Sequence, residues 1–255
     1  DNAIIIGREA GRGAMTSAAD GTIAIGFKAG EQNTSGDQNT YLGYSAGWKV
    51  QDGAHNTHVG YNAGAHATGS NNTFFGNNAG YGGQTSAPYS SGKRNVALGY
   101  NALAGFTTGN YNVAIGYKSA EALTTGEKNV AIGQESLEKG TSTYSNVAVG
   151  YRALQDATTD AVHSFVAVGT NAAKDVTAGL DCVAIGGGAG QKIAGDDVTV
   201  VGQAAGQYSA GGLNTFVGHE AGKGDNGNTT GTSNTAIGKS AFTQFTTGNY
   251  NTTIG

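Results

Sequence analysis

The sequence has little charge, one proline, one cysteine and one tryptophan. Charged residues make up 13% of the 255 residues, roughly half the usual share, and the net charge of −4 leaves no basic surface for nucleic acid. The lone Cys182 excludes a disulfide within the chain. No apolar run approaches the ~18 residues of a membrane-spanning helix. We therefore expect neither nucleic-acid binding nor membrane insertion.

Arrangements typical of catalysis and of metal or cofactor binding are also missing. The 18 acidic residues are scattered and form no repeated acid–base pair, and no Ser-His-Asp or Cys-His grouping stands out. The five histidines lack cysteines or carboxylates at ligand spacing. The glycine run at 186–190 lacks the Lys-Ser/Thr ending of a phosphate-binding loop. We predict a protein that is not an enzyme and uses no cofactor and no metal.

Glycine, in contrast, is abundant: 45 residues, more than double the usual share. One glycine recurs in every copy of a short repeat, most often 17 residues apart and otherwise 16 to 23 apart. These repeat glycines are Gly7, Gly26, Gly43, Gly60, Gly76, Gly99, Gly116, Gly133, Gly150, Gly169, Gly186, Gly202, Gly218, Gly238 and Gly255. The chain is thus an array of about fifteen copies of one unit.

Residues before each repeat glycine alternate with period two, which is typical of a strand and not of a helix. In the copy that ends at Gly116, Val113 and Ile115 point one way while Ala114 points the other. The stretch after the glycine, such as 120–125, is long enough for a second short strand before a turn. Two strands and two turns in about 17 residues make one rung of a roll.

Stacking of the rungs follows from backbone hydrogen bonding. A rung cannot pair its own strand N–H and C=O groups, but the rungs on either side can. We predict an all-β fold, a parallel β-roll or β-solenoid of about fifteen rungs of 16–23 residues, as a single domain over 1–255. Because the chain opens within a repeat, we expect it to be a piece of a longer fibrous chain.

The aliphatic residue before the repeat glycine is predicted to line the interior as a core column. Its members are Ile25, Leu42, Val59, Leu98, Ile115, Ile132, Val149, Val168, Ile185 and Ile237. The opposite face carries mainly Gly and Ala. One rung buries few large side chains, so we expect this small-residue face to pack against partner chains. Asn stands four residues before the glycine in ten of the fifteen copies, and stacked Asn side chains that bond one another explain this column better than a ligand does.

The segment 112–120, Asn-Val-Ala-Ile-Gly-Tyr-Lys-Ser-Ala, resembles the head repeat of trimeric autotransporter adhesins, the YadA-like head. Segments 129–136 and 95–103 resemble it too, and similar arrays occur in phage tail-fibre proteins. The resemblance covers nearly the whole chain, although the repeat here is longer. It implies a left-handed parallel β-roll that assembles as a homotrimer and lies outside the cell, on the cell surface or in a virion fibre.

Two sets of aromatic residues interrupt the small-residue pattern and are candidates for a surface or an interface. Either they form a platform for sugar rings or a host receptor, or they pack between chains and along the column. The candidates are Tyr41, His58, Phe74, Tyr44, Tyr61, Tyr100, Tyr117 and Tyr151. Two long repeats carry insertions, one at about 81–92 that contains Pro88 and a smaller one at 223–232. Insertions in solenoids project as loops, often on a binding face.

Three functions remain in competition. The chain is an adhesin head or tail-fibre shaft that binds itself and a host surface glycan or protein, or it is a structural filament whose rods join end to end. An ice-binding solenoid would need a regular Thr array, and the Thr pairs in this chain are irregularly spaced. We favour the attachment shaft.

Overall fold

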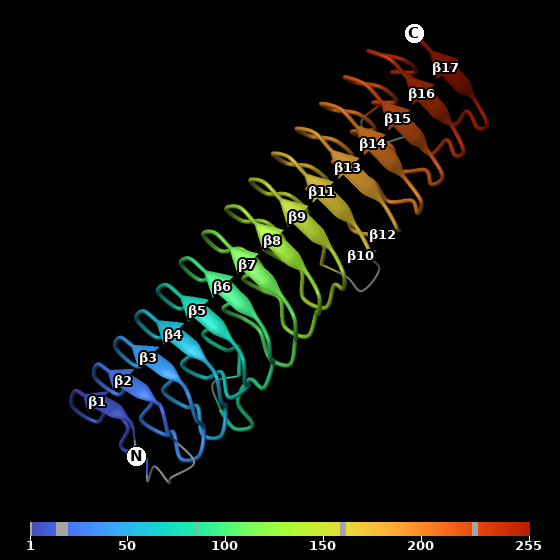
Figure 1. Cartoon of the computed structure of the whole chain (residues 1–255). Helices are drawn as coiled ribbons and strands as arrows, with labels where there is room; N and C mark the ends of the chain where they lie inside the picture. Colours follow the sequence, from blue (N-terminus) through green and yellow to red (C-terminus); the bar gives the residue numbers. More distant parts are fainter. Residues whose placement is uncertain (1, 14–19, 85, 159–161, 226–228) are drawn as a thin grey trace. The chain divides into compact units, whose positions relative to one another are not determined.

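The computed structural model describes residues 2–13, 20–84, 86–158, 162–225 and 229–255. The chain divides into two compact units, Asp1–Lys128 and Asn129–Gly255. Each unit is a stack of coils of the chain, and each coil is one copy of the same repeat (Figure 1). The described residues contain strands and turns but no helix.

Among the described residues of the first unit, seven parallel strands stand side by side in chain order. They are β1 (Ile4–Ile6), β2 (Ile23–Ile25), β3 (Thr40–Leu42), β4 (Thr57–Val59), β5 (Thr73–Phe75), β6 (Val96–Leu98) and β7 (Val113–Ile115). Each pairs with the equivalent residues of the next repeat, so that Ala24 lies beside Tyr41 and His58 beside Phe74. The predicted in-register parallel solenoid is confirmed.

In the part of the second unit that the structure describes, eight parallel three-residue strands make the main sheet. They are β8 (Val130–Ile132), β9 (Val147–Val149), β11 (Val166–Val168), β13 (Val183–Ile185), β14 (Thr199–Val201), β15 (Thr215–Val217), β16 (Thr235–Ile237) and β17 (Thr252–Ile254). Two short strands, β10 (Val162–His163) and β12 (Gly179–Leu180), pair in parallel as a separate sheet.

The second strand predicted for every rung is wrong for most of the described repeats. The stretch after the repeat glycine forms turns, because residues two and four places after the glycine have left-handed backbone, as Lys118 (φ 54°) and Ala120 (φ 49°) do. A strand cannot include that conformation. The turn still bonds to its neighbour in the stack, since Lys118 N–H donates to the carbonyl of Tyr100 at 2.9 Å.

The repeat glycine is required by the close approach of successive turns. Gly99 has a φ of 130°, a conformation that is rare for other residues. A Cβ placed there would lie 2.6 Å from the carbonyl oxygen of Gly116 in the next repeat. This explains why no other residue replaces the glycine in any copy.

The predicted core column is wrong, because the alternating strand presents the opposite face to the interior. The residue two places before the glycine points inward: Ala24, Tyr41 and Phe74 are fully buried. Its neighbours on either side point outward, and Leu42 and Leu98 are each 43% exposed in the single chain. The ten residues assigned to the core are half-buried or exposed: Ile25, Leu42, Val59, Leu98, Ile115, Ile132, Val149, Val168, Ile185 and Ile237.

The interior is narrow, which is why the small residues line it. Behind each strand lies the Ala or Ser found three residues after the repeat glycine, and Ala46 and Ala102 are fully buried there. Little room remains for side chains of both strand and turn. The predicted packing of the Gly/Ala face against partner chains is therefore also wrong: in the described residues that face is the core of the chain itself.

The asparagine column is a buried ladder of hydrogen bonds. The Asn39 side chain accepts a bond from the Asn56 N–H at 2.8 Å and donates to the carbonyl of Gly53 at 2.8 Å. Asn56 and Asn95 continue the pattern, with Asn95 donating to the carbonyl of Gly109 at 2.9 Å. The structural interpretation of this column is confirmed, because each of these amides bonds two backbone groups of the next repeat, an N–H and a carbonyl.

Candidate interaction surfaces

The outward side of each sheet forms an apolar surface that we call the outer strip. It consists of the residues one and three places before each repeat glycine. In the first unit these are Ile4, Ile6, Ile23, Ile25, Thr40, Leu42, Thr57, Val59, Thr73, Phe75, Val96, Leu98, Val113 and Ile115. In the second unit they are Val130, Ile132, Val147, Val149, Val166, Val168, Val183, Ile185, Thr199, Val201, Thr215, Val217, Thr235, Ile237, Thr252 and Ile254.

The strip carries large apolar side chains and no charge. Within the sheet of the first unit, Phe75 is 54% exposed and Val96 37%; in the second unit Ile185 is 40% exposed. The only polar members are threonines. An apolar face of this extent, continuous from strand to strand, is typical of a surface that another protein covers.

A row of aromatic rings borders the outer strip one residue after the repeat glycine. Phe27 stacks on Tyr44 with ring centroids 5.0 Å apart, and Tyr44 stacks on Tyr61 at 5.1 Å. Tyr100 and Tyr117 form a second stack at 5.4 Å. The rings follow one another because successive repeats present them in register.

The row is exposed, so its members remain candidates for an interface. Tyr44, Tyr61, Tyr100 and Tyr117 are 46–50% exposed. In the second unit Tyr151 is 38% exposed and packs its ring against the Arg152 guanidinium, 4.9 Å from the ring centroid. The structure places these five tyrosines on the surface, where rings extend the apolar character of the strip to its edge.

The other three aromatic candidates do not form a surface. Tyr41, His58 and Phe74 are fully buried, stacked inside consecutive repeats with His58 5.5 Å from Tyr41 and 4.9 Å from Phe74. A sugar or receptor cannot reach them. They face inward because they occupy the residue two before the glycine, which alternation directs to the interior.

Burial leaves polar atoms of this stack without hydrogen-bond partners: both ring nitrogens of His58 and the Tyr41 hydroxyl. Burial lowers the pKa of His58 to about 3, so the ring is neutral at physiological pH. Burial likewise raises the pKa of Tyr41 above its usual value. The stack therefore acts as apolar filling and not as a source of acid–base chemistry.

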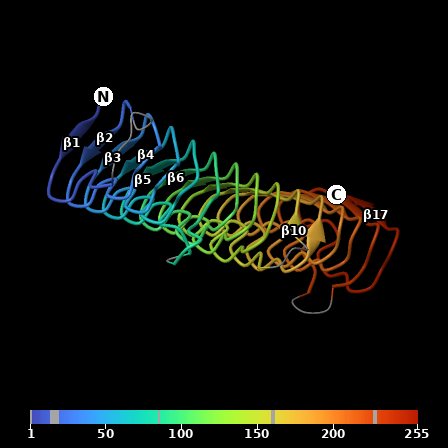
Figure 2. The same ribbon diagram turned by 90° about the horizontal axis from the view of Figure 1, so that it is seen from below.

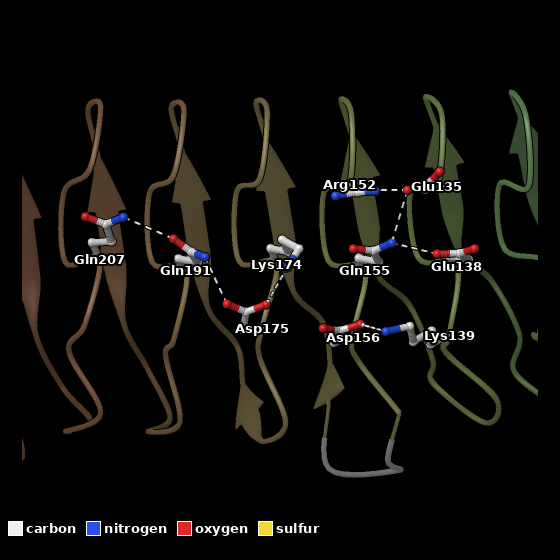
Figure 3. A network of polar contacts seen from close by, with 10 residues as sticks. All are labelled: Glu135, Glu138, Lys139, Arg152, Gln155, Asp156, Lys174, Asp175, Gln191 and Gln207. Carbon is white, nitrogen blue, oxygen red and sulfur yellow. Dashed lines mark hydrogen bonds and ion pairs between the residues drawn. The ribbon is translucent and has the colours of Figure 1, made fainter. Parts of the chain in front are cut away.

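Charged and amide side chains form a polar ladder along the turns of the second unit (Figure 3). Glu135 accepts hydrogen bonds from Arg152 at 2.6 Å and from Gln155 at 3.3 Å. Lys139 pairs with Asp156 at 2.7 Å, and the hydrogen bond to Asp156 raises the lysine pKa. These charges are paired with neighbours one repeat away, so the ladder offers no free acid or base.

Further along the ladder the contacts pass through amides. Gln191 donates to Asp175 at 2.9 Å and accepts from Gln207 at 3.0 Å (Figure 3). Lys174 pairs with the other oxygen of Asp175 at 2.9 Å. The two glutamine bonds join neighbouring repeats, whereas Lys174 and Asp175 are adjacent in sequence, so the ladder both links repeats and pairs charges within one of them.

Cys182 is buried, and burial raises the pKa of its thiol to about 11. Its sulfur donates to the carbonyls of Leu180 and Gly195 at 3.2 and 3.3 Å. Within the part of the chain that the structure describes, no three His, Cys, Asp or Glu side chains gather at a possible metal site. Across those same residues we find no helix of the length and apolarity that a bilayer span needs.

The structure describes the two predicted insertions to different extents. The loop at about 81–92, of which residue 85 lies outside the described residues, stands between β5 and β6, and its described part projects on the side away from the strands (Figure 2). The smaller one at 223–232 follows β15, and its residues 226–228 lie outside the described residues. The outer strip itself was missed as a surface, although its alternation with an inward Ala is visible in the repeat.

Comparisons with protein-family models, with curated proteins and with solved structures gave no match.

Proposed function

We propose that this chain is a non-catalytic attachment shaft, an adhesin head or tail-fibre segment, whose copies associate side by side through the outer strip. The observation that carries the proposal is the strip: apolar, without charge, and repeated on every strand. Leaving such a surface in water is unfavourable by roughly 25 cal/mol for each Å² of apolar area. Covering it gives the chain the additional burial that its narrow interior does not provide.

A second copy of this chain is the partner that fits the strip best. The strip repeats at the spacing of parallel strands, about 4.8 Å, and presents one row of side chains per repeat. A partner with the same spacing keeps every row in contact over the whole length. Copies of the same chain have that spacing, whereas a globular partner meets only a few rows.

The resemblance to the YadA-like head extends this proposal. It implies that three copies associate, that each coil is left-handed, and that the assembly lies outside the cell, on a cell surface or a virion fibre. The exposed tyrosine row at the edge of the strip supports side-by-side association, since aromatic rings are enriched at protein interfaces. The attachment partner is a host glycan or protein.

Native mass spectrometry tests the association. The wild-type chain is expected at three times its mass of 25.5 kDa. Changing Leu98 and Ile115 to Asp places charges in the strip and is expected to release single chains, since a buried unpaired charge is strongly unfavourable. The matched control changes the exposed Gln84 and Ser86 to Asp and keeps the assembly.

A wild-type chain that stays single at high concentration would overturn the proposal. Micrometre-long fibres would favour the alternative of a structural filament formed end to end. Circular dichroism of the charged variant confirms that the β-structure is intact.

A further inference from the structure

The insertion loop between β5 and β6 is held firmly at both of its ends. Ser90 bonds to the backbone of the preceding repeat, with its N–H donating to His66 at 3.0 Å and its carbonyl accepting from Thr68 at 2.7 Å. On the other side, the N–H of Gly83 donates to the carbonyl of Phe106 at 2.8 Å. These bonds fix the backbone of the loop at Gly83 and at Ser90.

Aromatic rings meet beneath this loop. His66 is 3% exposed and lies edge-on to Tyr81 at 4.6 Å and parallel to Tyr89 at 5.8 Å. Trp48 lies 5.7 Å from His66, and the Lys49 ammonium sits 3.7 Å from the Trp48 ring centroid. Burial, and to a lesser extent Lys49, lowers the pKa of His66, so the ring remains neutral. The His66 ring therefore supports Tyr89 from one side.

A hollow of about 480 Å³ opens beside Tyr89, within the range of volumes that small-molecule sites occupy. Tyr89 and Pro88 supply apolar surface, while Gln51, Gln84 and Thr108 supply amide and hydroxyl groups. Asp52 is the one charged side chain in its lining, and its Oδ1 accepts a hydrogen bond from Ser35 at 2.9 Å.

These groups match a neutral sugar. A pyranose ring has an apolar face of C–H groups that packs on an aromatic ring, and hydroxyls at its rim that bond amides, hydroxyls and a carboxylate. An anionic ligand would meet Asp52 without a cation in the lining to balance it. A single carboxylate also gives too few ligands for a metal ion.

We propose that this hollow, bounded by Tyr89, Pro88, Gln51, Gln84 and Thr108, binds a neutral hexose unit of a glycan. The inference rests on the proposed attachment function and names the class of ligand for it. The loop projects on the side away from the strands (Figure 2), so copies joined through the outer strip leave the hollow open. The site is thus compatible with assembly.

The fluorescence of Trp48, the only tryptophan of the chain, reports on the site because its ring belongs to the same cluster. The assembled protein is titrated with the neutral disaccharides lactose, maltose, cellobiose and mannobiose and, as an anionic comparison, with sialyllactose. Saturation-transfer NMR records which sugar protons contact the protein. We expect saturable binding of at least one disaccharide. Tyr89→Ala is expected to weaken it at least tenfold, Tyr89→Phe to retain it, and Thr108→Ala to weaken it several-fold.

Tyr117→Ala, an exposed tyrosine away from the hollow, is the matched control and should bind as the wild type does. Failure of all four disaccharides to bind, unchanged binding by Tyr89→Ala, or a preference for sialyllactose would overturn the inference. Native mass recorded on the same samples separates the two proposals. Sugar binding by a single chain overturns the self-associated shaft alone, and a stable assembly that binds none of the sugars overturns the sugar site alone.

Discussion

Two regions of the molecule fill the same narrow interior in opposite ways. In β3, β4 and β5 of the first unit the strand supplies a large ring and the turn is glycine, as in Phe74 with Gly80. In β8 and β9 of the second unit the strand supplies alanine and the turn supplies leucine, as in Ala148 with Leu154. In each pair the strand residue and the turn residue are six residues apart in the sequence. Both turn residues have left-handed backbone, with φ 53° at Gly80 and 52° at Leu154.

In these repeats a large residue at one of the two positions stands with a small residue at the other. A Cβ at Gly80 would lie 2.5 Å from the Phe74 ring, so a large strand residue excludes any side chain on its turn. The pattern holds for Tyr41 with Gly47 and for Phe216 with Gly222, where a Cβ would also clash with the ring. Well-packed interiors tolerate exchanges that keep the total volume.

The largest expected effect comes from breaking this pairing. Gly80→Leu forces a side chain into the Phe74 ring and should lower the free energy of unfolding by about 3 kcal/mol or more. Phe74→Ala should cost about 3–5 kcal/mol through the cavity that it leaves. Combining both substitutions recreates the alanine–leucine arrangement of the second unit. Urea denaturation should then show a double variant at least about 1.5 kcal/mol more stable than the sum of the single costs predicts.

Additive costs in that cycle would contradict the volume exchange. The reciprocal pair, Ala148→Phe with Leu154→Gly, is the matched control in the second unit. It should show coupling of the same sign.

The asparagine ladder occurs in both units, so substitutions in it test a feature that the two units share. Asn95→Ala in the first unit and Asn146→Ala in the second each remove a buried amide that accepts from the next repeat at 2.9 Å. Each should cost about 2–3 kcal/mol, since two hydrogen bonds are lost and buried backbone groups remain unpaired. Urea denaturation measures both, with the exposed Asn77→Ala as a control near zero. Unequal costs would show that the ladder depends on the core beside it.

The smallest expected effect is a gain in stability, and it concerns the buried stack of Tyr41, His58 and Phe74 in the first unit. His58→Phe keeps the ring stack and removes two buried nitrogens without partners, so the free energy of unfolding should rise by about 1–3 kcal/mol at neutral pH. The His58 pKa is about 3 in the folded chain and 6.5 as its ordinary value. Unfolded chains therefore bind a proton that folded chains exclude. Protonation of His58 therefore takes nothing from the free energy of unfolding of the wild type above about pH 6.5. Below that pH the free energy of unfolding falls by about 1.4 kcal/mol per pH unit as the pH drops toward 3.

The histidine prediction is checked by unfolding the wild type and His58→Phe across that pH range. The difference between the two should widen toward acid pH. A constant difference would show that the folded chain takes up the His58 proton as readily as the unfolded chain does.

Much of the fold could be predicted from the sequence because the repeat marks its own boundaries. The alternation around residues such as Val113 and Ile115 located the strands, and the recurrent glycine and asparagine located the turns and the ladder. The second strand was predicted wrongly because left-handed backbone at ordinary residues such as Lys118 and Ala120 comes from stacking with neighbouring turns, not from local preference.

The inward face was assigned wrongly because alternation defines two faces without saying which one is inside. The aliphatic face is the more hydrophobic of the two, and a single chain leaves it exposed. The sequence does hold the missing signal: wherever the residue two before the glycine is large, as at Tyr41, His58 and Phe74, the residue six further on is glycine. Such compensation occurs only between side chains that share an interior. The hollow beside Tyr89 had a weaker signal, the long insertion alone.

The central claim is that the aliphatic side of each strand faces outward and is covered by another copy. Alkylation of an introduced thiol tests it directly, with Ala97→Cys, Leu98→Cys and Ser86→Cys each made in a Cys182→Ala chain and followed over a range of protein concentration. We predict slow reaction at position 97 and fast reaction at position 86 throughout, with position 98 fast in dilute solution and slow once the chains assemble. Position 98 reacting slowly at every dilution would place it inside its own chain, and fast reaction at every concentration would show that no partner covers the strip.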